Sequence, residues 1–201
     1  RVLAAAGVRP VETDLGEYIC QLADDPPSHI IAPAMHKSQD EIAELFVKHH
    51  GTPRLDRAEQ LTREAREKLR GHFLGADLGI SGGNFLIAET GSVALVTNEG
   101  NGRLVTTLPR VHIAITGIEK VVPTLEDLAT LMRLLPRSAT GQNISNYVSV
   151  LTGTRDSESG EGPEHLYIIL VDNGRSGLVG SELQDMLRCI RCGACMNHCP
   201  V

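Results

Sequence analysis

The first third of the chain places apolar and polar residues at the spacing of α-helices. Ser38 and Glu41 have the spacing of a capping box, in which each side chain satisfies an otherwise unpaired backbone N–H at a helix start. Apolar residues follow at helical intervals over residues 42–46, and Gly51 suits the left-handed position that ends a helix. Residues 57–74 repeat the pattern, with one apolar stripe among many Arg and Glu residues. We therefore expect two helices here.

The middle of the chain changes to short apolar runs separated by glycine-containing turns. The turns are predicted at residues 89–91 and 98–102, and Pro109 separates the last two runs. Runs of this length that are rich in Val, Ile and Thr are typical of β-strands. Four strands are therefore expected, over residues 85–88, 92–97, 103–108 and 111–116.

The last third of the chain returns to longer elements. Thr124 precedes a leucine-rich helical stripe and is expected to cap that helix. Residues 166–171 form an unbroken apolar run, which predicts a buried strand over residues 165–171, and residues 172–177 form the loop after it. Ser181 and Gln184 have the spacing of a capping box for a helix that leads into the cysteines at the chain end. Strands that alternate with helices in this way predict an α/β fold whose sheet is at least partly parallel.

Composition narrows the classes of function. The formal net charge is −6 and aromatic residues make up 3% of the chain, so a basic, base-stacking surface for nucleic acid is not expected. The longest apolar run, residues 166–171, is far shorter than the roughly 20 residues that cross a bilayer. The opening RVLAAAGVRP lacks an initiator Met and is too weakly apolar for a secretory signal. We expect a cytoplasmic protein without a transmembrane segment, and a sequence cut from a longer one at both ends.

Four of the five cysteines lie close together at the chain end. The series Cys189-x2-Cys192-x2-Cys195-x3-Cys199-Pro200 has the spacing of the bacterial ferredoxin run. Thiolates two residues apart on a tight loop each reach a different iron of one cubane, and the glycine after the second cysteine lets the backbone approach closely. In two-cluster ferredoxins the fourth cysteine binds the other cluster. The spacing therefore predicts a 4Fe-4S site with these four cysteines as ligands.

Zinc and disulfides are the other uses of such thiols. Structural zinc sites usually pair two separated C-x2-C knuckles, and this sequence has no second knuckle. Disulfides need an oxidising compartment, for which the sequence gives no support. Cys20 lies in an amphipathic stretch and is interpreted as a buried apolar residue. His198 is interpreted as a solvated loop residue, and His49 and His50 as a helix end rather than metal ligands.

Longer stretches of the sequence resemble a known family. Iron–sulfur subunits of the LutB/LldF type carry segments similar to TDLGEYICQLADDPPSHIIAPAMHK, GISGGNFLIAETGSVALVTNEGNGR, LPRVHIAITGIEK and ILVDNGRS, in this order and followed by the cysteine run. These subunits contain a LUD (lactate utilisation) domain. The resemblance therefore implies a LUD domain over residues 1–180, with a fold of the NagB/RpiA/CoA-transferase type. Residues 181–201 would be the first half of a helical ferredoxin-like module.

The resemblance also implies a function. Members of this family take part in the bacterial oxidation of L-lactate to pyruvate with two partner subunits, so an iron–sulfur electron-transfer role is expected, with an unidentified electron acceptor. Members also carry a second cysteine motif downstream, which the present sequence does not contain. The implied cofactors are two 4Fe-4S clusters in the longer polypeptide, with an incomplete set of ligands in the residues given.

Glu89 and Thr90 are candidates for substrate contact. They lie where a strand is expected to end, which is where ligands bind in α/β sheets. In the CoA transferases that the fold resembles, a Glu in a comparable part of the fold acts as nucleophile, so the resemblance makes Glu89 a candidate catalytic residue. The alternative interpretation is that Thr90 belongs to a turn and Glu89 satisfies nearby backbone groups.

A second group of candidates suits an anion. Asn98, Asn101 and Arg103 combine glycine-enabled backbone donors with a cation, which fits a carboxylate or a phosphate. The same residues also fit an ordinary hairpin connection. Arg175 lies in a loop between an expected strand and an expected helix, where an anion can bind. Because this loop leads into the cysteines, we favour a role in coupling the cluster module to the main body.

Two functions from other classes compete with electron transfer. In the first, the LUD domain is itself an enzyme of acyl or CoA chemistry that uses Glu89, and the cluster is structural. In the second, the chain is a binding or assembly module whose cluster senses oxidation. The candidate residues are compatible with all three functions at this stage.

Overall fold

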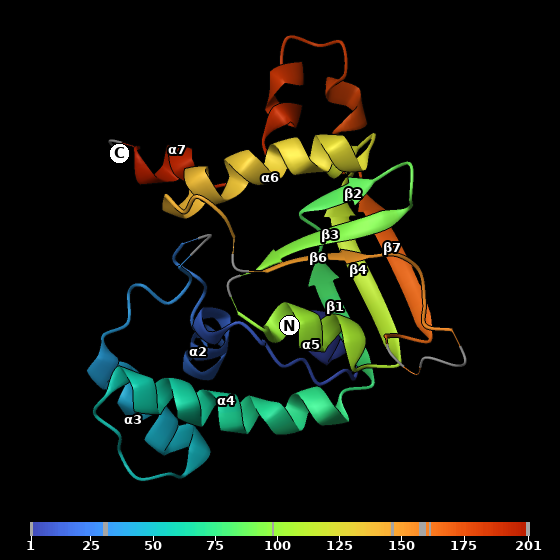
Figure 1. Cartoon of the computed structure of the whole chain (residues 1–201). Helices are drawn as coiled ribbons and strands as arrows, with labels where there is room; N and C mark the ends of the chain where they lie inside the picture. The colour runs from blue at the N-terminus through green and yellow to red at the C-terminus, as the bar shows by residue number, and fades with distance from the viewer. Residues whose placement is uncertain are drawn as a thin grey trace. The chain divides into compact units, whose positions relative to one another are not determined.

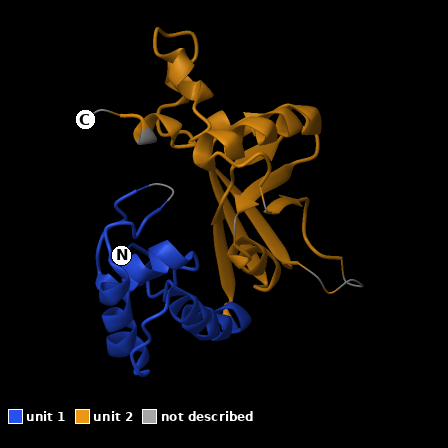
Figure 2. Ribbon diagram, turned by 60° about the vertical axis from the view of Figure 1, so that its left-hand side comes forward, with its two compact units in different colours: residues 1–75 blue, residues 76–201 orange. Residues whose placement is uncertain are grey.

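The computed structural model describes the chain over residues 2–29, 32–97, 99–145, 147–156, 160 and 162–199. It divides into two compact units, unit 1 over residues 1–75 and unit 2 over residues 76–201 (Figure 2). Unit 1 is helical, and both sheets belong to unit 2 (Figure 1). Within the described ranges, no helix combines the length and the apolar character that crossing a bilayer requires.

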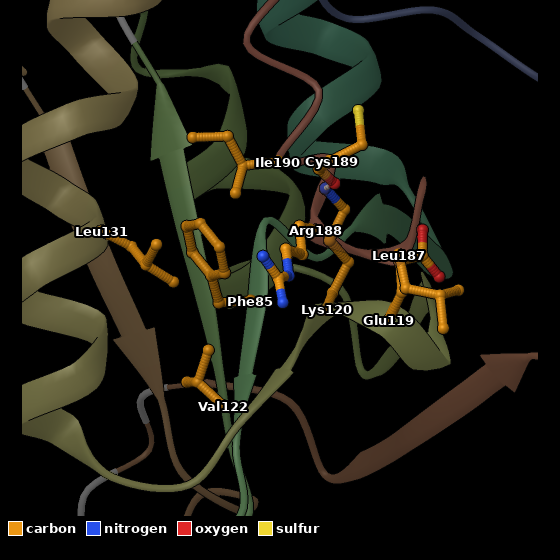
Figure 3. Close-up of a pocket in the computed structure, with 9 residues that line it drawn as sticks. All are labelled: Phe85, Glu119, Lys120, Val122, Leu131, Leu187, Arg188, Cys189 and Ile190. Carbon is orange, nitrogen blue, oxygen red and sulfur yellow. Dashed lines mark hydrogen bonds between the residues drawn. The ribbon is translucent and has the colours of Figure 1, made fainter. Parts of the chain in front are cut away.

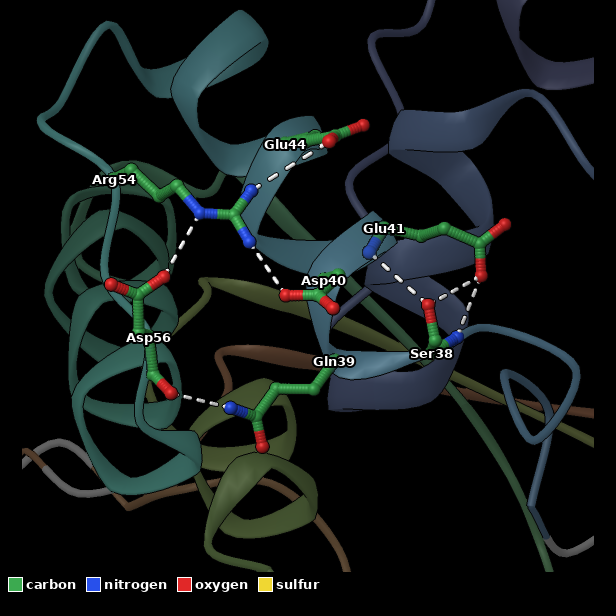
Figure 4. Close-up of polar contacts among 7 residues, drawn as sticks. All are labelled: Ser38, Gln39, Asp40, Glu41, Glu44, Arg54 and Asp56. Carbon is green, nitrogen blue, oxygen red and sulfur yellow. Dashed lines mark hydrogen bonds and ion pairs between the residues drawn. The ribbon is translucent and has the colours of Figure 1, made fainter.

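Unit 1 contains the two predicted helices, which are confirmed as α3 and α4. Ser38 Oγ accepts from the Glu41 N–H at 3.3 Å and the Glu41 carboxylate accepts from the Ser38 N–H at 2.8 Å, which completes the capping box (Figure 4). Gly51 ends the same helix with a φ of 67°, which glycine adopts without strain. Arg54 pairs with Asp40 in the first turn at 2.6 Å (Figure 4). The helices are α1 (Val2–Ala5), α2 (Leu15–Ala23), α3 (Gln39–His50) and α4 (Ala58–Gly75).

The core of unit 1 encloses a polar network. Tyr18 and Phe46 pack with their ring centroids 6.4 Å apart, and the Tyr18 hydroxyl lies 2.8 Å from His50 Nε2. The Nδ1 atom of His50 lies 2.8 Å from Glu64 Oε1, and the Thr52 hydroxyl donates to the same oxygen. The side chains of His50 and Glu64 are 4% and 8% exposed. His50 therefore ends α3 as predicted, and its side chain is buried in the core of unit 1.

Cys20 lies on α2 and faces the interior of unit 1. The residue is 2% exposed, and its thiol donates to the Pro33 carbonyl with an S–O distance of 3.6 Å. Burial raises the pKa of the Cys20 thiol. The prediction that Cys20 is a buried apolar residue is confirmed.

Unit 2 contains two sheets (Figure 1). The first is parallel and has the order β1 (Leu78–Gly82), β4 (Val111–Gly117), β7 (His165–Val171). The second is mixed and has the order β5 (Val121–Val122), β2 (Phe85–Ile87), β3 (Ser92–Thr97), β6 (Tyr147–Leu151). Helix α6 (Leu125–Thr140), capped by Thr124 as predicted, packs on the second sheet. The prediction of an α/β fold with a partly parallel sheet is confirmed.

The chain passes between the two sheets at Gly83, which connects β1 to β2. A Cβ atom at Gly83 would lie 3.2 Å from Thr116 Cβ and 3.2 Å from Val93 Cγ1, so a side chain there would be crowded. Val93 and Ala114 are fully buried and form part of one apolar cluster, although Ala114 belongs to the parallel sheet and Val93 to the mixed one. This cluster joins the two sheets into one unit.

The predicted strand over residues 103–108 is wrong. The structure has a helix here, α5 (Asn101–Thr107). The hydroxyls of Thr106 and Thr107 donate to carbonyls one turn earlier at 2.9 and 2.7 Å. These side chains therefore form hydrogen bonds within the helix, although threonine locally favours a strand. The helix packs so closely on β1 that a Cβ at Gly79 would overlap the Val105 carbonyl oxygen. Tertiary packing therefore decides this segment, against its local preference.

Strand β7 is present as predicted, but the prediction that it is buried is wrong. Tyr167, Ile169 and Leu170 are 55%, 45% and 52% exposed. The strand pairs with β4 along its length, and among the described residues no strand pairs with its other edge. An unbroken apolar run is typical of parallel strands that are covered on both faces. The side chains of β7 point to the two faces of the sheet, and their exposure means that neither face is fully covered at this strand.

The segment after β7 consists of short turns and not of the predicted α-helix. The Ser181 hydroxyl accepts from the Leu183 N–H at 3.2 Å, and the Gln184 N–H donates to the Ser181 carbonyl. The predicted capping box therefore does not form, because the Ser181 side chain takes part in a tighter local turn. The elements are η2 (Ser176–Leu178), η3 (Gln184–Arg188) and α7 (Ala194–Asn197).

Candidate functional site

The four cysteines of the chain end all follow η3: Cys189 and Cys192 precede α7, Cys195 lies in α7, and Cys199 follows it. All are free thiols, with Cys192 half-buried and Cys189, Cys195 and Cys199 exposed. Gly193, which follows the second cysteine, has a φ of 76° and precedes α7. A left-handed residue at this point turns the chain between the second and third cysteines, and glycine adopts that conformation without a steric cost.

The donor chemistry of this segment fits an iron–sulfur cluster. Four free thiols with intervals of two, two and three residues are the ligand set of a ferredoxin run. In the part of the chain that the structure describes, no group of three or more Cys, His, Asp or Glu side chains is arranged to hold a metal ion. Metal binding and the folding of ligand loops are coupled, so a cluster would have to draw these thiols together. His198 is an exposed loop residue, as predicted.

Lys120 attaches residues 189–199, which we call the cysteine segment, to the preceding part of unit 2, which we call its body. It ends the 3₁₀ helix η1 (Ile118–Lys120), which follows β4, and it is 6% exposed. Its Nζ atom donates to the Cys189 carbonyl at 3.0 Å (Figure 3). Burial lowers the pKa of Lys120, while the Cys189 thiol and the Glu119 carboxylate act in the opposite direction. A buried basic side chain therefore lies directly beside a predicted cluster ligand.

Glu119 is a second buried charged group at this place, with a side chain that is 6% exposed. Arg175 Nε lies 2.7 Å from its Oε2 atom, in an ion pair without hydrogen-bond geometry, and Arg191 Nη2 lies 3.8 Å from its Oε1 atom. Gly117 leaves room for this arrangement, because a Cβ there would overlap the Glu119 carboxylate. We call Glu119, Lys120, Arg175 and Arg191 the anchor cluster.

The anchor cluster lies at the carboxyl edge of the parallel sheet. Glu119 and Lys120 follow β4, Arg175 follows β7, and Arg191 belongs to the cysteine segment. This edge is where ligands bind in α/β proteins. Arg175 pairs with Glu119, and its predicted roles in coupling the cluster module and in binding an anion both stay predictions.

A cavity of about 250 Å³ lies between the cysteine segment and the body of unit 2 (Figure 3). Phe85, Val122 and Leu131 line it from the body, and Ile190 lines it from the segment. Ile190 and Cys192 also pack against the apolar cluster that contains Phe85. Apolar contact thus adds to the polar attachment made by the anchor cluster.

Glu89 lies in the turn between β2 and β3, as predicted. Its Oε1 atom accepts from the Leu125 N–H at 2.8 Å, which satisfies an unpaired donor in the first turn of α6. The Thr90 hydroxyl lies 2.7 Å from the Ser92 hydroxyl. Glu89 therefore satisfies a backbone group, which was the alternative interpretation of this residue. Its role as a nucleophile stays a prediction.

The second group of candidates lies at the other end of β3. Asn101 begins α5, and the Arg103 guanidinium lies 5.6 Å from the centroid of the Tyr147 ring, while Asn98 lies outside the described residues. The expectation of a hairpin connection here is wrong, because the chain enters a helix. The six residues of β3 span roughly 20 Å, so the structure does not bring this group together with Glu89.

Sequence reasoning missed Glu119, Lys120 and Arg191. The available signal was a pair of charged residues three and four positions after the strand expected at residues 111–116, since the carboxyl end of such a strand is a common position for functional side chains. No local pattern indicates that Glu119 pairs with Arg191, because the two residues are far apart in the sequence.

Two known family models match the chain, one over most of its length and one at its cysteine-containing end. The family model described as the LUD domain matches residues 2–171, and that of the 4Fe-4S binding domain matches residues 184–201. Proteins named lactate utilization protein B from Geobacillus sp. (strain WCH70) and Shouchella clausii (strain KSM-K16) are both 52% identical to the chain over its full length. The protein of that name from Bacillus subtilis (strain 168) is 50% identical. The chain spans 42% of the length of each of these relatives.

A crystal structure of a DUF162 family protein from Deinococcus radiodurans is similar to part of the chain, with a TM-score of 0.39 and 22% identity. The similarity covers 50% of this chain and 57% of that one. The LUD domain match covers most of the sequence, including every strand of both sheets. The chain therefore belongs to the LUD domain family.

Proposed function

We propose that this chain is the LUD portion and the first cluster-binding segment of an iron–sulfur electron-transfer subunit in L-lactate oxidation. The observation that carries the proposal is the run of four free thiols with ferredoxin spacing, on the segment that matches the 4Fe-4S binding domain. The proposed substrate, lactate, follows from the similarity to relatives named lactate utilization protein B. We further propose that the boundary between the LUD domain and the cluster module lies near residue 180.

The four cysteines have different roles in the proposed function. Cys189, Cys192 and Cys195 would hold one 4Fe-4S cluster, and Cys199 would serve a second cluster that takes its other ligands from a longer polypeptide. When bound, such a cluster supplies one-electron transfer. Within unit 2, Lys120 holds the backbone of Cys189, and Cys192 packs on the apolar cluster around Phe85. Other subunits of a lactate-oxidising complex and an electron acceptor would complete the path, in the cytoplasm, where thiols stay reduced.

Anaerobic reconstitution of the full-length polypeptide with iron and sulfide is expected to load about eight irons per chain, as two four-iron clusters. Reduction should then produce a reversible electron paramagnetic resonance (EPR) signal. Cys192→Ser should remove the signal of one cluster and the lactate-dependent reduction seen with the partner subunits. Cys20→Ala is the matched control, since Cys20 is buried in unit 1, and it should keep the full iron load. Stoichiometric zinc, or iron that never changes oxidation state, would contradict the proposal.

Two variants of Glu89 separate electron transfer from acyl or CoA chemistry. Glu89→Ala removes the acceptor for the Leu125 N–H and is expected to lower the free energy of unfolding by about 1 kcal/mol, as for other helix caps. Glu89→Gln keeps an acceptor and should keep most of that stability. Both variants should retain lactate-dependent cluster reduction, measured by EPR beside urea unfolding. If both lose activity with the cluster intact, Glu89 is catalytic and the electron-transfer proposal is incomplete.

A further inference from the structure

We infer that the anchor cluster, with Lys120 as its main contributor, fixes the first half of the cysteine segment and raises the reduction potential of the cluster bound there. The inference rests on the proposed function, because it concerns the cluster that Cys189 and Cys192 would hold. It assigns Lys120 and Glu119 as positioning residues with opposite effects on that potential.

The attachment is continuous over the first half of the segment. Cys189 receives the hydrogen bond from Lys120, and Ile190 packs against the apolar cluster around Phe85. Arg191 then pairs with Glu119, and Cys192 again packs on the same apolar cluster. Each of the four residues from Cys189 to Cys192 thus contacts the body of unit 2. The first two cluster ligands are therefore held in place relative to the parallel sheet.

The charges of the anchor cluster favour a reduced iron–sulfur cluster. Three basic side chains surround one carboxylate, and Lys120 and Glu119 are each 6% exposed, so bulk water screens them weakly. A cubane with four thiolate ligands carries a net negative charge, which increases when it gains an electron, and cluster potentials respond to charge and hydrogen bonding in the surroundings. A basic group beside Cys189 therefore stabilises the reduced form more than the oxidised form.

Lys120 and Glu119 make the inference testable because they carry opposite charges at the same place. In the reconstituted full-length polypeptide, Lys120→Met should disfavour reduction about tenfold, which is about 59 mV toward negative potential for one electron. Glu119→Gln should shift the potential in the positive direction, because it removes the negative charge and leaves the basic side chains. A purely structural role would not produce shifts of opposite sign. The potentials are measured by redox titration followed by EPR.

Two controls accompany these variants. Lys120→Arg keeps the charge and should keep the potential near that of the unmodified protein. Arg110→Met removes a basic residue that precedes β4, at the opposite end of the strand from Lys120, and should leave the potential unchanged. If the unmodified protein binds no cluster, the proposed function and this inference both fall. If it binds one and Lys120→Met leaves the potential unchanged, this inference alone is overturned.

A second measurement covers the case in which Lys120→Met does not load iron. Hydrogen exchange in the full-length protein before reconstitution should be slow at the Cys189 amide, whose N–H donates to the Met186 carbonyl at 3.3 Å. Lys120→Met should lose that protection, whereas Lys120→Arg should keep most of it. Equal protection in Lys120→Met and in the unmodified protein would show that Lys120 does not hold the segment, and the inference would be wrong.

Discussion

Replacing Gly79 with alanine is expected to lower the free energy of unfolding of unit 2 by about 3 kcal/mol, the upper part of the usual range for overpacking. A Cβ at this position of β1 would overlap the Val105 carbonyl oxygen of α5 and lie 3.2 Å from Pro109 Cγ. The obstacle is helix backbone, so no side-chain rotation relieves it and α5 must move away from the sheet. Urea unfolding followed by circular dichroism measures the loss.

Gly82→Ala is the matched control for Gly79→Ala, because both glycines lie in β1. The nearest atom to a Cβ at Gly82 is the Ile115 carbonyl oxygen at 3.9 Å, which is an ordinary contact distance. Alanine there restricts the unfolded chain and should change stability by less than about 1 kcal/mol in either direction. If the two variants are equally stable, α5 does not pack on β1 in the way described.

Features whose determinants lie close together in the sequence could be predicted. Helix α3 is an example, because its start at Ser38, its apolar face and its end at Gly51 are all encoded within one short segment. The cysteine segment is another, because ligand identity and spacing are local properties, and the position of Gly193 follows from the same pattern. In both cases the physical cause acts over a few residues, so a single sequence contains it.

Features that depend on distant neighbours could not be predicted. The β-branched residues of 103–108 favour a strand locally. However, β1 and β4 are parallel, and parallel strands need a crossover connection, to which α5 contributes by packing on Gly79. The exposure of Tyr167 has a similar origin, since it depends on the order of strands in the sheet and on which elements cover each face of the sheet. Propensity and periodicity carry no information about strand order.

The candidate site shows the same difference between local features, which could be predicted, and features that depend on distant residues, which could not. The cysteines were found from their spacing. The roles of Lys120 and Glu119 depend on their contacts with the cysteine segment at the carboxyl edge of the parallel sheet, and these contacts are known only from the structure. Arg175 was singled out for its place between a strand and the cysteines, and its partner could not be named. The type of cluster ligand can therefore be predicted from the sequence, whereas the neighbouring charged residues that would affect the cluster potential cannot.

The second large effect is expected in unit 1, where His50→Leu should lower the free energy of unfolding by about 3–5 kcal/mol, the usual cost of removing one member of a buried pair. The Glu64 side chain is 8% exposed and would keep only the Thr52 hydroxyl as a partner at Oε1. Its Oε2 atom already lacks a hydrogen-bond partner among the described residues, so the carboxylate depends on His50. Hydrogen exchange of α3 and α4 amides in the whole chain, combined with urea unfolding, measures the loss.

A double variant separates the charge from the packing. Adding Glu64→Leu to His50→Leu removes the unpartnered carboxylate and should recover most of the lost stability, because an apolar pair of similar size needs no partner. Tyr18→Phe removes only the hydroxyl that faces His50 and should cost about 1 kcal/mol, the net value of one hydrogen bond. If the double variant is no more stable than His50→Leu alone, the two residues contribute only by packing. If it is more stable, the histidine is retained in the core because a buried acid requires it.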